Sequence, residues 1–122
     1  MPHDFSDTAQ RALEEAIRVA KYTGARILLL HVALPDRAAL ASMPETETLK
    51  DIAEHPALDG VEVTHTVTFG APDEQILDSI HTSTVDLVIM GTNGRRGIRS
   101  VLVGSIAQIV VRCSPVPVMV LS

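Results

Sequence analysis

The sequence predicts an α/β fold in which an open, mostly parallel, twisted sheet carries helices on both faces. Short apolar runs alternate along the chain with segments of helical periodicity, which is the pattern of a layered parallel sheet. The chain is 46% hydrophobic but contains only two Phe, one Tyr and no Trp, so its core is aliphatic, as in strands buried on both faces. A length of 122 residues supports one domain over residues 1–122.

The first helix and the strand after it are marked by short-range signals. We expect the helix to begin near Asp7, with Asp4 or Ser6 as its cap, and to stop at Gly24. Small and apolar residues recur between these ends at helical spacing. Residues 26–32 are too few and too continuously apolar for an amphipathic helix, so they predict a strand buried on both faces.

The middle of the chain gives weaker signals. Three prolines interrupt residues 34–58, where only a short helix over 45–55 is expected. Residues 61–69 alternate and are rich in β-branched side chains, which predicts a strand near a sheet edge. The next helix is expected to begin at Pro72, because proline is favourable in the first turn of a helix. Asp73 and Glu74 follow, and their negative charges are favourable at the positive end of the helix dipole.

The last third repeats the strand–helix–strand order. Residues 85–90 predict a strand that ends at Gly91, and a helix is expected from Ser105 to about Arg112. The final strand, residues 116–121, contains Pro117 and is therefore expected at or near an edge of the sheet.

Composition excludes several classes of function. A formal net charge of −5, no basic run and few aromatic residues argue against a nucleic-acid surface. No apolar stretch approaches the roughly 18 residues of a membrane span, and the first residues do not resemble a signal peptide. Cys113 is the single cysteine and can form no internal disulfide. We therefore expect a cytoplasmic protein that binds neither membranes nor nucleic acid.

The segment from Gly91 to Ser105 carries the most specific chemistry. Its spacing is glycine, two residues, glycine, nine residues, glycine and serine. Gly91 allows a sharp turn off the strand, and Gly94 allows the backbone to approach a ligand closely. Gly104 and Ser105 stand at a helix start, where free N–H groups and the helix dipole favour an anion. A phosphate chain fits this geometry, although three glycines can also form a plain strand-to-helix loop.

Two better-known phosphate motifs do not fit this segment. No Lys follows the last glycine as in a Walker loop, and the spacing differs from the dinucleotide-binding fingerprint. Ser105 has no histidine that a motif would place beside it, so a hydrolase triad has no support. The five histidines show no metal-ligand spacing, and His31 and His65, on predicted strands, are expected to be hydrogen-bonded structural residues.

Nearly the whole chain resembles the universal stress proteins, in particular their ATP-binding type. The resemblance rests on the C-terminal stretch VDLVIMGTNGRRGIRSVLVGSIAQIVVRCSPVPVMVL, which carries that family's glycine pattern, helix and Pro-Val-rich strand. The N-terminal stretch PHDFSDTAQRALEEAIRVAKYTGARILLLHV is similar to the family's first loop, first helix and second strand. The resemblance implies the Rossmann-like fold of that family, and only residues 34–60 show no likeness.

The resemblance also implies a nucleotide site. It places the first loop and one strand residue beside the adenosine, a near wall on the glycine-rich loop, and a phosphate end at the helix start. Asn93 stands where many relatives have histidine, and it can still form a hydrogen bond. The implied nucleotide-binding residues are Pro2, His3, Asp4, Val32, Met90, Gly91, Asn93, Gly94, Gly104, Ser105, Ile106 and Ala107.

The start of the chain departs from the family pattern. Relatives begin with an apolar strand that lies in the middle of the sheet, whereas here Met1 and Pro2 directly precede the first loop. Loss of that strand would leave backbone groups unpaired on both neighbours, at about 1–3 kcal/mol for each buried group. Three readings stay open at this point: a sequence that begins late, another chain that fills the gap, or a sheet that closes up.

The resulting prediction is a regulatory module that binds ATP, with Mg²⁺ accompanying the triphosphate. No general base for attacking water is identifiable, so any ATP hydrolysis or autophosphorylation is expected to be slow. The alternatives are a nucleotide-free interaction module of the same fold and, ranked last, an enzyme that activates a substrate with ATP. The apolar strand at residues 116–121 predicts a homodimer, because exposed strand edges pair.

Overall fold

A computed structural model describes residues 1–33, 44–92 and 104–122, and it confirms an α/β fold of parallel strands and helices. Residues 34–43 and 93–103, including Asn93 and Gly94, lie outside the described part. The elements, in chain order, are α1 (Asp7–Thr23), β1 (Ile27–Ala33), α2 (Pro44–Ala53), a 3₁₀ turn (Pro56–Leu58), β2 (Val63–Phe69), α3 (Pro72–Thr82), β3 (Val88–Gly91), α4 (Ser105–Cys113) and β4 (Val118–Leu121).

Helix α1 has the ends that the sequence predicts. The Ser6 hydroxyl accepts a hydrogen bond from the Ala9 N–H at 3.1 Å and caps the first turn. Gly24 closes the helix in the left-handed region with φ 79°, where its N–H donates to the Ala20 carbonyl at 2.8 Å. The buried face is an alanine-rich stripe that also contains Leu13 and Ile17.

The strands form two separate pairs. β1 pairs with β2 in parallel from Ile27 opposite Val63, and β3 pairs with β4 in parallel from Val88 opposite Val118. Each of the four strands has one ladder partner in these two sheets, so β2 and β4 have a free edge, as do β1 and β3. No hydrogen-bonded ladder joins β1 to β3 among the described residues, so the sheet does not close up between them.

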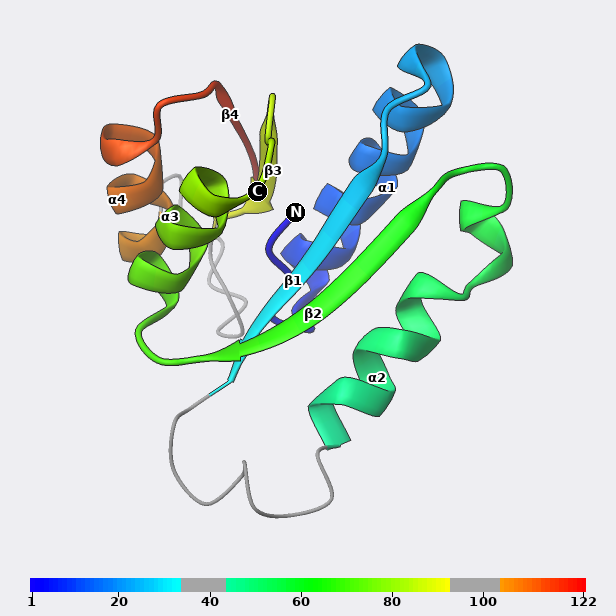
Figure 1. Cartoon of the computed structure of the whole chain (residues 1–122), viewed down its shortest axis with the longest axis horizontal. Coiled ribbons are helices and arrows are strands. Elements are labelled where there is room, and N and C mark those ends of the chain that lie inside the picture. The colour runs from blue at the N-terminus through cyan, green and yellow to red at the C-terminus, as the bar shows by residue number, and fades with distance from the viewer. Residues whose placement is uncertain (34–43, 93–103) are drawn as a thin grey trace.

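The amino-terminal residues lie along the free edge of β1. Pro2 forms a single parallel bridge with Leu30, the Leu30 N–H donates to the Met1 carbonyl at 3.0 Å, and the His3 N–H donates to the Leu30 carbonyl at 2.7 Å. Figure 1 shows this end of the chain between β1 and β3. The ladder on this side of β1 is therefore one bridge long.

The last strand begins later than the sequence predicts. The Ser114 hydroxyl accepts from the Val116 N–H at 3.1 Å and donates to the Val116 carbonyl at 2.8 Å, which holds the chain in a turn. Pro117 has no N–H to give to a ladder, so β4 starts at Val118.

The helices form two layers, each with its own apolar cluster. Buried side chains of α1 and α2 pack together with β1 and β3 on one face, whereas side chains of α3 and α4 pack with the same two strands on the other. Figure 1 shows α3 and α4 together on the side opposite α1 and α2. No helix within the described ranges is long and apolar enough to cross a membrane.

Candidate functional site

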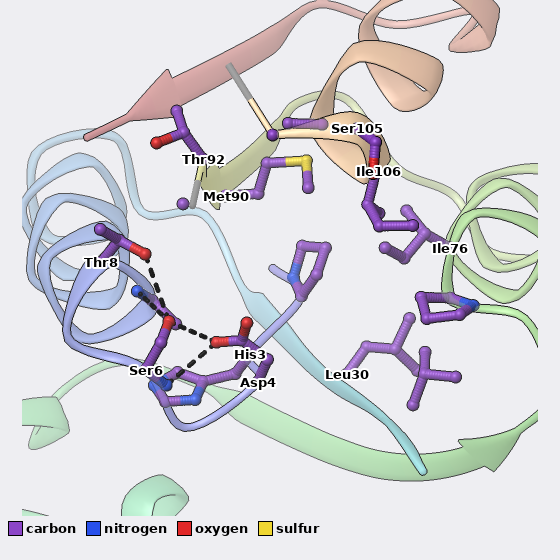
Figure 2. Close-up of a pocket in the computed structure, with 17 residues that line it drawn as sticks. His3, Asp4, Ser6, Thr8, Leu30, Ile76, Met90, Thr92, Ser105 and Ile106 are labelled. Carbon is purple, nitrogen blue, oxygen red and sulfur yellow. Dashed lines mark hydrogen bonds between the residues drawn. The ribbon is translucent and has the colours of Figure 1, made fainter. Parts of the chain in front are cut away.

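A hollow of about 260 Å³ lies where the carboxyl ends of β1 and β3 meet (Figure 2). This is the position at which open parallel sheets bind ligands. Its lining comes from the amino-terminal loop, the first turn of α1, β1, the start of α3, the end of β3 and the start of α4. The lining residues are Pro2, His3, Asp4, Ser6, Thr8, Ala9, Leu30, Val32, Pro72, Ile76, Met90, Gly91, Thr92, Gly104, Ser105, Ile106 and Ala107.

The structure brings together every predicted site residue that it describes. Ten of them, from four segments far apart in the sequence, line this one hollow: Pro2, His3, Asp4, Val32, Met90, Gly91, Gly104, Ser105, Ile106 and Ala107. This shared location shows that the residues lie together. It does not identify a ligand. Asn93 and Gly94, the other two, lie outside the described residues.

The carboxylate of Asp4 organises the start of α1. One of its oxygens, Oδ1, accepts from the Ser6 N–H at 3.0 Å and from the Ser6 hydroxyl. The Ser6 hydroxyl in turn lies 3.2 Å from the Thr8 hydroxyl, so three polar side chains form one chain of hydrogen bonds (Figure 2). Oδ2 of Asp4 takes part in none of these bonds. A carboxylate held in this way presents a fixed acceptor to the hollow.

His3 lines the hollow, but one nitrogen of its ring is already hydrogen-bonded within the amino-terminal loop. Its side chain is 3% exposed, and its Nδ1 accepts from the Phe5 N–H at 3.0 Å. Burial lowers the pKa of His3, which favours the neutral imidazole. Its Nε2 is buried and has no hydrogen-bond partner among the described residues. The imidazole therefore supports the loop through Nδ1, and its burial disfavours the charged form.

A stack of rings fixes the shape of the same loop. The Phe5 ring stacks on His31 at a centroid distance of 4.2 Å, and Phe5 itself adopts a positive φ of 68°. The His31 Nδ1 lies 2.7 Å from the His3 carbonyl, which confirms His31 as a buried, hydrogen-bonded structural residue. His65 is instead exposed on β2, so the corresponding prediction for that residue was wrong.

Gly91 is required for a different reason than the predicted sharp turn. It is not among the glycines with positive φ, and it ends β3 directly against the first turn of α1. A Cβ at this position would lie 2.8 Å from the backbone carbonyl carbon of Thr8 and 2.8 Å from its hydroxyl oxygen. The absence of a side chain therefore lets β3 and α1 approach each other at the floor of the hollow.

The first N–H groups of α4 have no acceptor inside the helix. Gly104 is the N-cap, with φ −62° and ψ 156°, and supplies no side-chain cap; the Gln108 N–H is the first that bonds within the helix, to the Gly104 carbonyl at 3.0 Å. The three N–H groups before it, of Ser105, Ile106 and Ala107, have no acceptor within the helix. Together with the helix dipole they form a cradle for an anion.

The other two helix starts at the hollow are less suited to an anion. At α1, Ser6 already caps the first turn and is bonded to the Asp4 carboxylate. At α3, Asp73 and Glu74 add negative charge to the first turn. Of the three helix starts, that of α4 is therefore the most favourable for an anion.

The opposite side of the hollow is apolar. Leu30, Ile76 and Ile106 lie across from the polar side chains of the amino-terminal loop, as Figure 2 shows. Backbone groups of β1 alternate along the strand: the Ile27 N–H bonds toward β2, whereas the Leu30 N–H bonds toward Met1. The same alternation directs the N–H and carbonyl of Val32 to the edge away from β2, next to the hollow. A flat polar ring could bond there while lying on aliphatic side chains.

Seven lining residues were not predicted. Ser6 was identified as a helix cap but not as part of the site, and Thr92 lies within the glycine-rich segment without belonging to its pattern. The others come from packing between distant elements, for which the sequence carries no local signal. The seven are Ser6, Thr8, Ala9, Leu30, Pro72, Ile76 and Thr92.

Comparison with known proteins supports one family. The family model for the universal stress protein family matches residues 1–122. A universal stress protein of Thermus aquaticus is 32% identical over 130 residues, which cover 98% of this chain and 93% of that relative.

Solved structures agree with the sequence comparison. Universal stress protein UspA from Lactobacillus plantarum superposes with a TM-score of 0.76 at 25% identity, covering 99% of this chain and 94% of that one. A universal stress protein solved in complex with cAMP superposes with a TM-score of 0.73 at 21% identity, covering 99% and 92% of the two chains, and so shares the fold. The chain belongs to the universal stress protein family.

Proposed function

We propose that this protein binds ATP in the hollow between the amino-terminal loop and the start of α4, and that occupancy regulates its conformation or assembly. The observation that carries the proposal is that ten residues from four distant segments, which the family resemblance assigns to one nucleotide site, line one hollow. That hollow joins an apolar wall to a helix start with open N–H groups, which are the two environments that a nucleotide needs.

The polarity of the hollow suggests how the nucleotide would lie. The triphosphate would occupy the α4 end, where Ser105 and the first N–H groups of the helix point, and away from the Asp4 carboxylate. The adenine would lie on the aliphatic wall, with its polar edge against the backbone of Val32. Asp4 would then accept a hydroxyl of the ribose through Oδ2.

One unpaired polar atom supports this fit. The Thr92 hydroxyl is buried, lines the hollow and has no hydrogen-bond partner within the described part of the chain. Burying such a hydroxyl without a partner is costly, by about 1–3 kcal/mol. A phosphate or ribose oxygen would provide the partner.

Magnesium is proposed only as a companion of the triphosphate. No group of three or more His, Cys, Asp or Glu side chains gathers in the described residues in a way that could hold a metal ion. The ion would be held mainly by phosphate oxygens and water, as is usual for Mg²⁺.

The side chains that line the hollow are better suited to holding a nucleotide in a regulatory role than to catalysing its hydrolysis. Within the described ranges, the ionisable side chains that line the hollow are Asp4 and His3. Asp4 is hydrogen-bonded to Ser6, and the Nδ1 of His3 already accepts from the Phe5 N–H. Neither is placed as a base for attacking water, so ATP hydrolysis is expected to be slow.

Calorimetric titration with ATP and Mg²⁺ tests the proposal, with Gly104→Val as the variant. The backbone at Gly104 has φ −62° and ψ 156°, which valine adopts without strain, so the variant is expected to fold. A branched side chain beside the open N–H groups is expected to weaken ATP binding about a hundredfold or more. The matched control is Val111→Ala, because Val111 is 50% exposed on the same helix and does not line the hollow.

The outcomes separate the candidate functions. Tight binding by the parent and by Val111→Ala, but not by Gly104→Val, supports the site. Unchanged binding by Gly104→Val would contradict it. No binding by the parent, together with no adenine absorbance at 260 nm in extracts of the purified protein, would favour the nucleotide-free interaction module.

We also propose that the protein forms a homodimer through β4. In the part of the chain that the structure describes, this strand pairs with β3 on one side only, so its other edge offers backbone groups to a second copy. Pairing of two such edges would bury the strand and continue the sheet across the dimer.

A further inference from the structure

Thr8 is a buried polar residue that lines the hollow but does not cap its helix. It lies in the first turn of α1, where the Ser6 hydroxyl accepts from the Ala9 N–H and so provides the cap. The start of the helix therefore does not need the hydroxyl of Thr8. That hydroxyl lies instead 3.2 Å from the hydroxyl of Ser6, on the polar side of the hollow.

The hydrogen bonds around Ser6 have one consistent direction. A hydroxyl has a single proton to donate and the Asp4 carboxylate can only accept, so the Ser6 proton is directed to Asp4. The Ala9 N–H donates to the Ser6 oxygen at 3.1 Å. The remaining contact of that oxygen can then be a hydrogen bond only if Thr8 is the donor. Thr8 therefore donates to Ser6, and Ser6 donates to Asp4, as the dashed lines of Figure 2 connect them.

This chain of bonds ends on one oxygen of the Asp4 carboxylate. Oδ1 accepts from the Ser6 hydroxyl and also from the Ser6 N–H, at 3.0 Å. Two bonds to one oxygen fix the plane of the carboxylate and leave Oδ2 for a ligand. A carboxylate that is fixed before the ligand arrives loses less conformational freedom on binding, and this preorganisation favours affinity.

The end of β3 holds Thr8 from its other side. A Cβ on Gly91 would lie 2.8 Å from the Thr8 hydroxyl oxygen and 2.9 Å from the Thr8 Cβ. The Thr8 side chain therefore lies directly on the backbone of Gly91, and as a β-branched side chain in a helix it has few rotamers to choose from. Contact with β3 thus fixes the orientation in which the Thr8 hydroxyl meets Ser6.

We propose that Thr8 is a positioning residue of the nucleotide site, which orients the Asp4 carboxylate toward a ribose hydroxyl through the hydroxyl of Ser6. This role rests on the proposed function, because the ligand must carry a ribose. Thr8 acts on the ligand only through Ser6 and Asp4, while Gly91 holds it in place. Loss of the Thr8 hydroxyl lets the carboxylate rotate, so the site loses selectivity for ribose over deoxyribose.

Two substitutions separate the hydroxyl of Thr8 from its packing. Thr8→Val keeps the shape of the side chain but lacks the hydroxyl, whereas Thr8→Ser keeps the hydroxyl and lacks the methyl group. A positioning role predicts that only Thr8→Val changes the site, and a packing role predicts the reverse. The matched control is Thr23→Val, because the Thr23 hydroxyl donates to the Val19 carbonyl at 2.7 Å on the same helix, is exposed and does not line the hollow.

Calorimetric titrations with ATP, 2′-deoxy-ATP and 3′-deoxy-ATP measure the selectivity for ribose. The parent is expected to bind one of the two deoxy analogues more weakly than ATP, which identifies the hydroxyl that Asp4 accepts. Thr8→Val is expected to weaken ATP binding about fivefold and to leave the affinity for that analogue unchanged. Thr8→Ser and Thr23→Val are expected to keep the parent's affinities for all three nucleotides.

Amide hydrogen exchange of the unliganded protein tests the orientation of Asp4 without a nucleotide. The Ser6 N–H donates to the Asp4 carboxylate, whereas the Gln10 N–H donates to the Ser6 carbonyl at 3.0 Å in the first turn of α1. In Thr8→Val the Ser6 N–H is expected to exchange about fivefold faster, and the Gln10 N–H at the parent's rate. A general weakening of α1 would accelerate both amides and would contradict a positioning role.

The titration of the parent distinguishes failure of this role from failure of the proposed function. No ATP binding by the parent would overturn the proposed function, and the role of Thr8 with it. If the parent binds ATP, the role alone is overturned when Thr8→Val keeps the parent's preference for ribose, or when Thr8→Ser loses as much affinity as Thr8→Val. Weaker ATP binding by Thr8→Val with unchanged exchange of the Ser6 N–H would also overturn it, because Thr8 would then contact the nucleotide directly.

Discussion

At the scale of single residues, Gly91 shows how one missing side chain decides the packing of two elements. The floor of the hollow is the contact between the end of β3 and the first turn of α1, and Thr8 is the residue that Gly91 meets. Thr8 is buried, and its hydroxyl lies in the chain of hydrogen bonds that begins at Asp4. A change at Gly91 therefore disturbs both the packing of α1 and the polar lining of the hollow.

The substitution Gly91→Ala is expected to destabilise the protein by about 1–3 kcal/mol. The new methyl group would lie 2.8 Å from a backbone carbon of Thr8, so α1 or β3 must shift to accommodate it. The measurement is the free energy of unfolding from urea denaturation of the parent and the variant.

A double-mutant cycle identifies the cause of this loss. Thr8→Ala removes the hydroxyl that would lie 2.8 Å from the new methyl group, but it leaves the Cβ and the backbone carbon in place. Gly91→Ala should therefore remain destabilising in the Thr8→Ala background, though by less than in the parent. Equal stability of Gly91→Ala and the parent would contradict the close approach.

Individual site residues could be predicted where the sequence carries a local pattern. Glycine spacing alone pointed to Gly91, Gly104 and Ser105, whereas Val32 and Pro2 were assigned from the family resemblance. Thr8 and Ile76 were missed because each has an ordinary role in its helix, and only packing between distant elements brings it to the hollow. The physical reason for Gly91 was also missed, since a contact with α1 leaves no mark on neighbouring residues.

At the scale of elements, β4 has two edges with different roles. The Pro117 and Leu121 carbonyls accept hydrogen bonds from β3, so odd-numbered backbone groups of β4 face its partner strand. By alternation, the groups of Val118 and Val120 face outward, where a second copy would pair. The two edges can therefore be tested separately by removing one N–H at a time.

Val120→Pro is expected to convert the proposed dimer to a monomer while largely preserving the fold. Proline removes an N–H that faces away from β3, and edge strands tolerate proline on that side. Met119→Pro is the matched control, because it removes an N–H that faces β3 and should lower Tm markedly. Sedimentation gives the assembly state, and thermal unfolding gives Tm. Pairing through this edge would be refuted if the Val120→Pro variant remained dimeric. It would also be refuted if the parent protein were monomeric at tens of micromolar.

Most elements were predicted correctly because their ends carry strong signals. Ser6 and Gly24 bracket α1 by a side-chain cap and a left-handed residue, and both are found in the structure. The strand predicted from residue 85 begins only at Val88, since pairing with β4 sets its start and β4 itself starts late. The ends of strands depend on their partners, which local periodicity does not reveal.

At the scale of the whole molecule, two half-sheets are held together by helices. The sequence predicted one open sheet, and only the family resemblance raised the question of what lies between β1 and β3. The apolar cluster beneath α1 contains Ile27 and Leu29 of β1 as well as Ile89 of β3. The cluster on the opposite face likewise combines Leu30 with Val88. Side chains rather than a backbone ladder therefore connect the halves.

This arrangement predicts that the two half-sheets unfold together. Leu13 is 2% exposed and belongs to the cluster that contains residues of both β1 and β3. Leu13→Ala is expected to lower the free energy of unfolding by about 2–5 kcal/mol. Because the cluster is shared, exchange of the Ile27 N–H in one half and of the Val88 N–H in the other should accelerate by the same factor.

Native-state hydrogen exchange of the parent and Leu13→Ala measures both amides in one experiment. The reporters are matched, since the Ile27 N–H bonds to Glu62 at 2.9 Å and the Val88 N–H bonds to Pro117 at 3.0 Å, each within its own half-sheet. Val111→Ala, at an exposed position of α4, should leave both rates near those of the parent. Faster exchange at Ile27 with an unchanged rate at Val88 would mean that the halves are independent units. In that case helix packing would be too weak to make the split sheet cooperative.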